Sequence, residues 1–249
     1  MKLKATLLLS TLALSATAFA QTKAPEPDYT LSFNAGVVSD YRYRGISQSR
    51  LKPAAQGGLD FAHKSGFYLG AWASTIKWIE DSQSTDGNIE LDLYGGYKGE
   101  LAKGLAYDVG VLRYEYVGNK LGNVPNYANA NTTEVYGALT AGVFTAKYSQ
   151  SLTNLFGNIN SKGSKYLDLS ANFDLGDGWT LTPHVGRQLV NNNAPYHYTD
   201  YSLTVAKDLG KGLTASLMAV DTNAKVGSYT WGGKYVGKAG VVAGLKYTF

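Results

Sequence analysis

Apolar and polar residues alternate along most of the chain, from Tyr29 to the last residue. In the first such segment, 29–44, odd positions carry Leu31, Phe33 and Val37, whereas even positions are mostly polar. Successive side chains of a β-strand point to opposite faces, so this pattern predicts strands with one apolar and one polar face. The alternation predicts twelve strands, over 29–44, 54–63, 66–75, 88–98, 105–114, 132–139, 144–152, 165–173, 179–188, 200–206, 213–220 and 239–249.

The connections between these segments alternate in length. Short turns such as 63–66 and 208–212 follow the even-numbered strands, and longer polar segments rich in Gly and Asn follow the odd-numbered ones. Outer-membrane barrels have this asymmetry, with short periplasmic turns and long extracellular loops. The sequence therefore predicts an all-β fold, a transmembrane antiparallel up-and-down barrel of about twelve strands.

A secreted β-sandwich would also alternate and turn at similar intervals. Mid-strand charges such as Asp60 and Asp168 suit a wet lumen better than a sandwich core. The chain also ends on an alternating strand whose Tyr247 and Phe249 resemble the assembly signal of bacterial outer-membrane proteins. Aromatic residues near strand ends suit interfacial girdles, namely Tyr29, Tyr41, Tyr43, Phe67, Tyr97, Phe173, Trp179, Tyr201, Tyr247 and Phe249.

The N-terminus has the three parts of a secretory signal. Lys2 and Lys4 precede an apolar run, and Ala18-Phe19-Ala20 supplies the small residues expected before cleavage. We predict a signal peptide over 1–20, a short periplasmic segment over 21–28 and the barrel over 29–249. Export through the periplasm to the bacterial outer membrane follows from this division.

Composition narrows the function classes. The chain has 29 Gly, 19 Tyr and no Cys, and only 17% of its residues are charged. The absence of Cys excludes disulfides, zinc–thiolate sites and a cysteine nucleophile. A formal net charge of +4 for the whole chain gives no reason to expect a nucleic-acid partner.

Motifs for catalysis or cofactors are missing. The segment 232–239 nearly fits a phosphate-binding loop, but Ala239 stands where Ser or Thr must reach Mg²⁺. The three histidines, His63, His184 and His197, have no metal-ligand spacing. We therefore expect no enzyme activity, no metal and no cofactor.

The polar faces supply the candidate functional residues. Charge on the lipid side of a membrane barrel is costly, so these residues are expected to line the lumen. Their acidic excess favours weak cation preference, and the alternative is a network of ion pairs that plugs a narrow barrel. The lumen-lining candidates are Asp40, Arg42, Arg44, Asp60, Glu90, Asp92, Asp108, Glu134, Lys147, Asp168, His184 and Lys246.

Three positions at the predicted extracellular end of the first strand, Arg42, Tyr43 and Arg44, have two interpretations. They could form a basic mouth that attracts anionic solutes. Alternatively, the arginines contact lipopolysaccharide phosphates or neighbouring loop carboxylates, because guanidinium groups suit both.

Two segments depart from simple alternation. Over 111–116 the apolar residues shift from odd to even positions, which suggests a β-bulge or a strand leaving the membrane. In the ninth strand, Pro183 and Arg187 fall on the expected lipid face, so that strand is expected to leave the hydrocarbon before Arg187.

Several stretches resemble one known family. They include Ser39-Asp40-Tyr41-Arg42-Tyr43-Arg44-Gly45, Gln56-Gly57-Gly58-Leu59-Asp60 and Glu90-Leu91-Asp92-Leu93-Tyr94-Gly95-Gly96-Tyr97. The chain is similar over essentially its whole mature length to the TorF family of porin-type proteins, also known as the Gcw_chp group. This resemblance implies an outer-membrane barrel of porin type, without a defined substrate.

Together these features predict a monomeric outer-membrane channel for passive diffusion of small hydrophilic solutes or ions. The competing hypothesis is a non-conducting structural or adhesion barrel whose loops bind a partner or lipopolysaccharide. Expected partners are outer-membrane lipids and lipopolysaccharide, the outer-membrane assembly machinery and small solutes.

Overall fold

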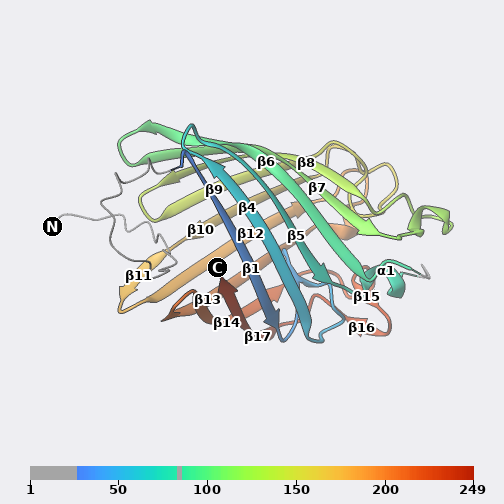
Figure 1. The fold of residues 1–249 in the computed structure, drawn as a ribbon. Coiled ribbons are helices and arrows are strands. Elements are labelled where there is room, and N and C mark those ends of the chain that lie inside the picture. Colours follow the sequence, from blue (N-terminus) through green and yellow to red (C-terminus); the bar gives the residue numbers. More distant parts are fainter. Residues whose placement is uncertain (1–26, 83–85) are drawn as a thin grey trace, which may run out of the picture.

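The computed structural model describes residues 27–82 and 86–249, which form a closed antiparallel barrel of twelve strands (Figure 1). Each barrel strand pairs with its neighbours along the chain, and pairing of β1 with β17 closes the ring. The barrel strands are β1 (Tyr29–Val38), β4 (Ala54–His63), β5 (Phe67–Thr75), β6 (Ile89–Ala102), β7 (Leu105–Val117), β8 (Thr132–Ala141), β9 (Phe144–Ser151), β10 (Lys165–Ala171) with its continuation β11 (Phe173–Gly176), β12 (Trp179–Leu189), β13 (Tyr198–Gly210), β14 (Leu213–Thr222) and β17 (Gly240–Thr248).

The two ends of the barrel differ, as predicted. Short turns join strands at one end, which we call the turn end, and six longer loops lie at the other, the loop end (Figure 1). The loops contain short elements, namely β2 (Arg42–Tyr43), β3 (Ile46–Ser47), α1 (Trp78–Asp81), η1 (Leu121–Asn123), η2 (Ala194–Tyr196), β15 (Thr230–Trp231) and β16 (Lys234–Tyr235). Among the described residues, no helix is long and apolar enough to cross a bilayer.

The outer wall is apolar. Leu31, Leu93, Leu167 and Leu217 are among the large apolar side chains that this wall exposes. Of the ten aromatic residues predicted to form girdles, eight are exposed in this way. The prediction is wrong for Tyr41 and Tyr43, which lie beyond the end of β1 and are enclosed by the barrel.

The shift of apolar residues from odd to even positions over 111–116 does not come from a β-bulge. β7 keeps an unbroken register with β6 from Ile89↔Val117 to Glu100↔Ala106. Leu112, Tyr114 and Tyr116 simply face inward, where they pack with residues from the loops. The interior is apolar at this height, so hydrophobicity no longer marks the outer face.

The ninth predicted strand, 179–188, is confirmed as β12, which continues past Arg187. That Arg187 lies beyond the hydrocarbon stays a prediction. β12 stays paired with β13 as far as Gln188, and exposed Arg187 donates to Thr199 Oγ1 at 2.9 Å. On one side, β12 pairs with β10 as far as His184 and with β11 from Leu181. Pro183 lies in the gap between these two pairings. Its missing N–H therefore costs no hydrogen bond on that side.

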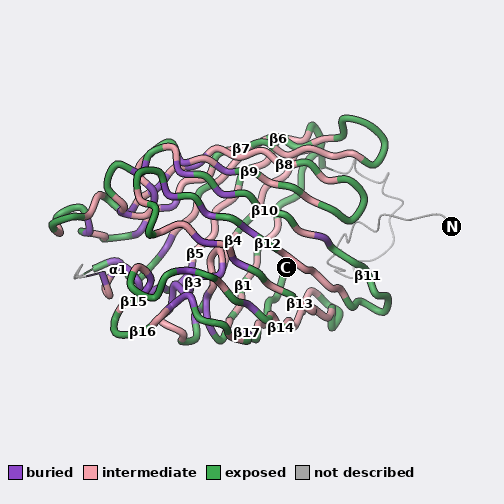
Figure 2. The backbone as a smooth tube through the Cα atoms, turned by 180° about the vertical axis from the view of Figure 1, so that it is seen from behind, coloured by how far each residue is buried: buried purple, intermediate pink, exposed green. Residues whose placement is uncertain are grey.

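The hydrophobic core lies inside the loop end, where Figure 2 shows most of the buried positions. One cluster includes Trp78, Ile79 and Leu121, and a second includes Ile46 and Val236. Ile79 and Leu121 have 0% exposure although both belong to loops. The loops are therefore a packed plug in the barrel mouth rather than a loose fringe.

The last strand is tied to the first at the turn end. Phe249 exchanges two backbone hydrogen bonds with Phe33, at 2.8 and 2.9 Å, and their rings stack with centroids 5.9 Å apart. Tyr247 stacks on Phe249 along the outer wall. The predicted signal peptide, 1–20, lies outside the described residues.

Candidate functional site

Tyrosine side chains lie over inward-facing glycines across the lumen wall. Asp60, Gly70 and Tyr94 stand in one row of β4, β5 and β6. A Cβ on Gly70 would lie 2.3 Å from the Tyr94 ring, so only glycine leaves room for it. The ring thus crosses β5, and its hydroxyl donates to Asp60 Oδ1 at 2.5 Å. Such an aromatic cover compensates for the missing side chain of a strand glycine.

The same three-strand arrangement recurs twice. In both cases the hydroxyl donates across a glycine strand to a carboxylate on the strand beyond it. The trios are Tyr68 over Gly96 to Asp108 at 2.5 Å, and Tyr166 over Gly186 to Asp200 at 3.0 Å. The tyrosines therefore fix the predicted lumenal acids Asp60 and Asp108 in place.

We expect Gly186→Ala to destabilise the barrel by about 1–3 kcal/mol, because overpacking and a broken buried hydrogen bond each have this magnitude. A Cβ on Gly186 would lie 1.9 Å from the Tyr166 hydroxyl and 2.8 Å from Asp200 Oδ2. Gly137→Ala is the matched control, since its Cβ would meet only Val109 Cγ1 at 3.9 Å. Urea unfolding in lipid vesicles measures both, and equal stabilities would contradict the role of the Tyr166 cover.

The first long loop turns back into the barrel as a hairpin of β2 and β3. Arg44 and Gly45 form its tip with positive φ angles of 46° and 77°, as a tight two-residue hairpin turn requires. A Cβ on Gly45 would lie 2.5 Å from Thr222 and 2.7 Å from Asp200, so the tip rests against β13 and β14. The two arginines thus belong to this inserted hairpin and not, as predicted, to the end of the first strand.

Arg44 reaches across the lumen and is fully engaged there. Its Nη1 and Nη2 donate to Glu134 at 3.1 and 2.7 Å, and Nη1 also donates to Gln188 Oε1 at 2.8 Å. The guanidinium lies over the Tyr166 ring, 4.1 Å from its centroid. Burial alone would lower the pKa of Arg44, but the Glu134 carboxylate outweighs it and raises that pKa well above its ordinary value. Arg44 is therefore a charged brace between the hairpin and β8.

Arg42 joins the first loop to the last. Its Nε donates to Asp40 Oδ2 at 2.5 Å, and Nη1 donates to the backbone oxygens of Val236 at 3.3 Å and Lys238 at 2.9 Å. Of the two sequence-based interpretations, the arginines thus follow the one in which they engage neighbouring carboxylates. They do not form an open basic mouth.

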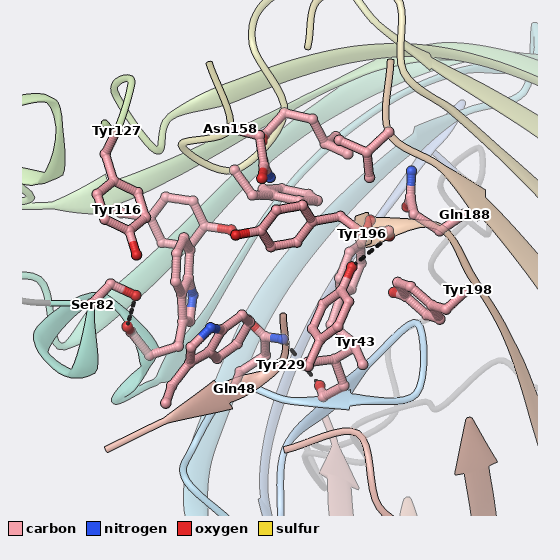
Figure 3. A pocket seen from close by; sticks show the side chains of 16 residues that line it. Tyr43, Gln48, Ser82, Tyr116, Tyr127, Asn158, Gln188, Tyr196, Tyr198 and Tyr229 are labelled. Atoms are coloured by element: carbon pink, nitrogen blue, oxygen red, sulfur yellow. Dashed lines mark hydrogen bonds between the residues drawn. The ribbon is translucent and has the colours of Figure 1, made fainter. Parts of the chain in front are cut away.

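Four cavities follow one another from the loop end toward the turn end. The outer cup is lined by Val124, Pro125 and Ile159 among others, and the aromatic cage by Trp78, Phe156 and Tyr229 among others. The two share Tyr127, Asn158 and Tyr196, which Figure 3 labels in the wall of the cage. The central cavity, lined by Arg44, Lys147 and His184 among others, shares Tyr43 with the cage. Ser216 of the lower cavity is the next inward position of β14 after Met218 of the central cavity. The volume open to the centre of a water molecule is about 590 Å³ in the cup, 70 Å³ in the cage, and 310 Å³ in each of the other two.

Several predicted residues line the lower two cavities. His184 bridges two carboxylates, with Nε2 3.0 Å from Asp168 and Nδ1 3.6 Å from Asp200. Lys147 Nζ lies 3.9 Å from the centroid of the Tyr136 ring in the central cavity, and Lys246 lines the lower one. Among the residues described, no cluster of His, Cys, Asp and Glu could hold a metal ion.

Two predicted acids are packed into the wall instead. Glu90 accepts from the Tyr41 hydroxyl at 3.3 Å and is 1% exposed. Within the described part of the chain, Glu90 Oε2 and Asp92 Oδ1 are buried without a hydrogen-bond partner. Neither residue lines any of the four cavities.

The family model for a bacterial protein of unknown function (Gcw_chp) matches residues 22–249. The chain belongs to this family. No curated protein matches it. The barrel is similar to a KdgM porin solved with disordered oligogalacturonate, with a TM-score of 0.56 and 8% identity over 88% of this chain and 98% of that one. It is also similar to a NanC porin, with a TM-score of 0.55 and 10% identity over 88% and 99% of the two chains. At these identities the likeness establishes the porin fold.

Sequence reasoning missed the tyrosine covers of this Gcw_chp protein. A signal was present, because Tyr94 and Gly70 both fall at even, inward-facing positions of neighbouring strands, as do Tyr68 and Gly96. It also missed the aromatic cage, since Trp78, Phe156 and Trp231 lie in segments with no alternation.

Proposed function

We propose that this Gcw_chp protein is an outer-membrane channel for passive diffusion of small hydrophilic solutes or ions. The single observation that carries the proposal is the succession of four cavities from the outer cup to the lower cavity. The inward residues Asn34, Gln56, Thr214 and Ser216 make the lower part polar. The exposed apolar outer wall supports a bilayer location.

The inserted hairpin lies on this path, between the cage and the central cavity. Tyr43 separates the cage from the central cavity, and Arg44 lines the central cavity below it. Both arginines of the hairpin are neutralised by Asp40 and Glu134. Acids therefore outnumber free cations along the lumen, which supports weak cation selectivity. A reversal potential showing anion preference would overturn this selectivity.

The lipid and assembly partners are part of the same proposal. Tyr247 and Phe249 lie on the outer wall of the final strand, where assembly machinery can recognise them. Exposed Arg187 lies near the loop end of the outer wall, where it can meet a lipopolysaccharide phosphate. No part of the channel mechanism needs a cofactor or a chemical step.

A single introduced cysteine tests the path, because the natural chain has none. We expect a charged methanethiosulfonate reagent to reduce the conductance of Ser216→Cys, whose side chain lines the lower cavity. Leu217→Cys is the control, since Leu217 is exposed on the outer wall. The measurement is planar-bilayer recording of refolded protein before and after the reagent. Absence of discrete conductance steps in the unmodified protein would contradict the channel and favour the non-conducting adhesion barrel.

A further inference from the structure

The aromatic cage has a wall of unusual composition. Nine of its sixteen lining residues are aromatic (Figure 3). The rings hold one another by edge contacts: Trp78 and Tyr116 have centroids 5.0 Å apart at 87°, and Tyr198 and Tyr229 lie 5.1 Å apart at 76°. Because these rings are already packed against one another, binding a solute would cost little side-chain entropy.

The wall is also uncharged. None of the described residues that line the cage is Asp, Glu, Lys or Arg. Burial raises the pKa of Tyr43 and of Tyr229 well above the ordinary tyrosine value, so both phenols stay neutral. Arg44 lies against the ring of Tyr43, 4.9 Å from its centroid, but its guanidinium is engaged by Glu134 and Gln188. An anionic solute would therefore find no counter-charge in the cage.

Polar groups of both kinds are free in this wall. Trp78 Nε1 is buried without a partner among the described residues, and it can only donate. Gln48 and Asn158 use their amide nitrogens on the backbone oxygens of Ile46 at 3.0 Å and Leu155 at 2.9 Å. Their amide oxygens have no partner in the described part of the chain and are left to accept. A carboxylate can only accept a hydrogen bond, so it could use the Trp78 donor but not the amide oxygens. A quaternary ammonium has no N–H and no acceptor, so it could hydrogen-bond to neither. A hydroxyl both donates and accepts, so it could use both kinds of group.

We propose that the aromatic cage binds one ring of an uncharged sugar as the solute enters the channel. Sugar rings have apolar faces for the aromatic wall and hydroxyls at their rim for Trp78, Gln48 and Asn158. The cage volume of about 70 Å³ is the space that the centre of a water molecule can reach. Taken as a sphere and enlarged by the radius of water, it is roughly 8 Å across, which suits a single pyranose ring. This inference rests on the proposed channel function, and it names the solute class.

The test is a binding titration of the refolded full-length chain in detergent micelles by isothermal calorimetry. The probes are maltotriose, trigalacturonate and choline. We expect maltotriose to bind more tightly than the other two. Trp78→Phe keeps the ring but removes the donor, and we expect it to weaken maltotriose binding by about 3–10-fold, the effect of one lost hydrogen bond.

Trp179→Phe is the matched control, because Trp179 is exposed on the outer wall near the turn end, and it should leave binding unchanged. Asn158→Ala provides a second test if Trp78→Phe fails to fold. Equal or tighter binding of trigalacturonate or choline would overturn the inference. Clear KCl conductance without maltotriose binding would overturn it while leaving the channel intact. Maltotriose binding without conductance would instead refute the channel and leave the sugar site standing.

Discussion

Replacing Arg44 with alanine is expected to raise the unit conductance and to destabilise the protein by about 3–5 kcal/mol, the usual effect of breaking a buried ion pair. The substitution removes both hydrogen bonds to Glu134 and leaves that carboxylate buried without its cation. It also removes the guanidinium that lies over Tyr166 and holds the hairpin tip across the lumen. Single-channel recording and urea unfolding in vesicles measure the two effects.

Two further variants separate the loss of the Arg44–Glu134 contact from the loss of a positive charge in general. Arg44→Lys keeps the charge but cannot form the two-pronged contact, so we expect intermediate values in both measurements. Arg187→Ala removes an arginine whose described partner is only the Thr199 hydroxyl on the exposed surface, and it should change neither. An Arg44→Ala channel with unaltered conductance would show that the hairpin does not limit the pore.

The barrel itself could be predicted because two simple rules govern its strands. Charges such as Asp60 and Asp168 avoid lipid, and apolar residues such as Leu93 and Leu217 seek it, so alternation alone places the wall. The rule fails at Tyr114 and Tyr116 because there the interior is apolar too. Hydrophobicity then no longer distinguishes inside from outside, and a bulge becomes one of two explanations for a strand that is in fact continuous.

The plug and the cage could not be predicted from the same pattern. They consist of single residues from loops far apart in the chain, such as Trp78 beside Trp231, whose centroids lie 5.8 Å apart. A loop with no alternation gives no local signal of which residue packs inward. The tyrosines that cover glycines are an intermediate case. Predicting them requires knowing both which residues pair between strands and which face each residue occupies.

Leu121→Ala is expected to loosen the plug strongly while the barrel stays intact. Leu121 belongs to η1 in the third long loop and has 0% exposure, and a Cβ on Gly157 would lie 2.6 Å from its Cδ2. Emptying a fully buried leucine site costs about 2–5 kcal/mol. That loss would fall on the loop core, since the barrel strands keep their ladders, and local opening should rise at least about 30-fold.

Limited proteolysis of the protein in vesicles measures this opening directly. We expect faster cleavage within 118–131 and an unchanged heat-resistant barrel on electrophoresis. Leu101→Ala is the matched control, because Leu101 is 62% exposed beside the turn at 103–104 and supports no buried cluster. If Leu121→Ala were cleaved no faster than Leu101→Ala, the loops would be held by their hydrogen bonds and ion pairs rather than by the apolar core. If the barrel itself unfolded, the plug and the wall would be one cooperative unit, and the loops would then support the pore that they narrow.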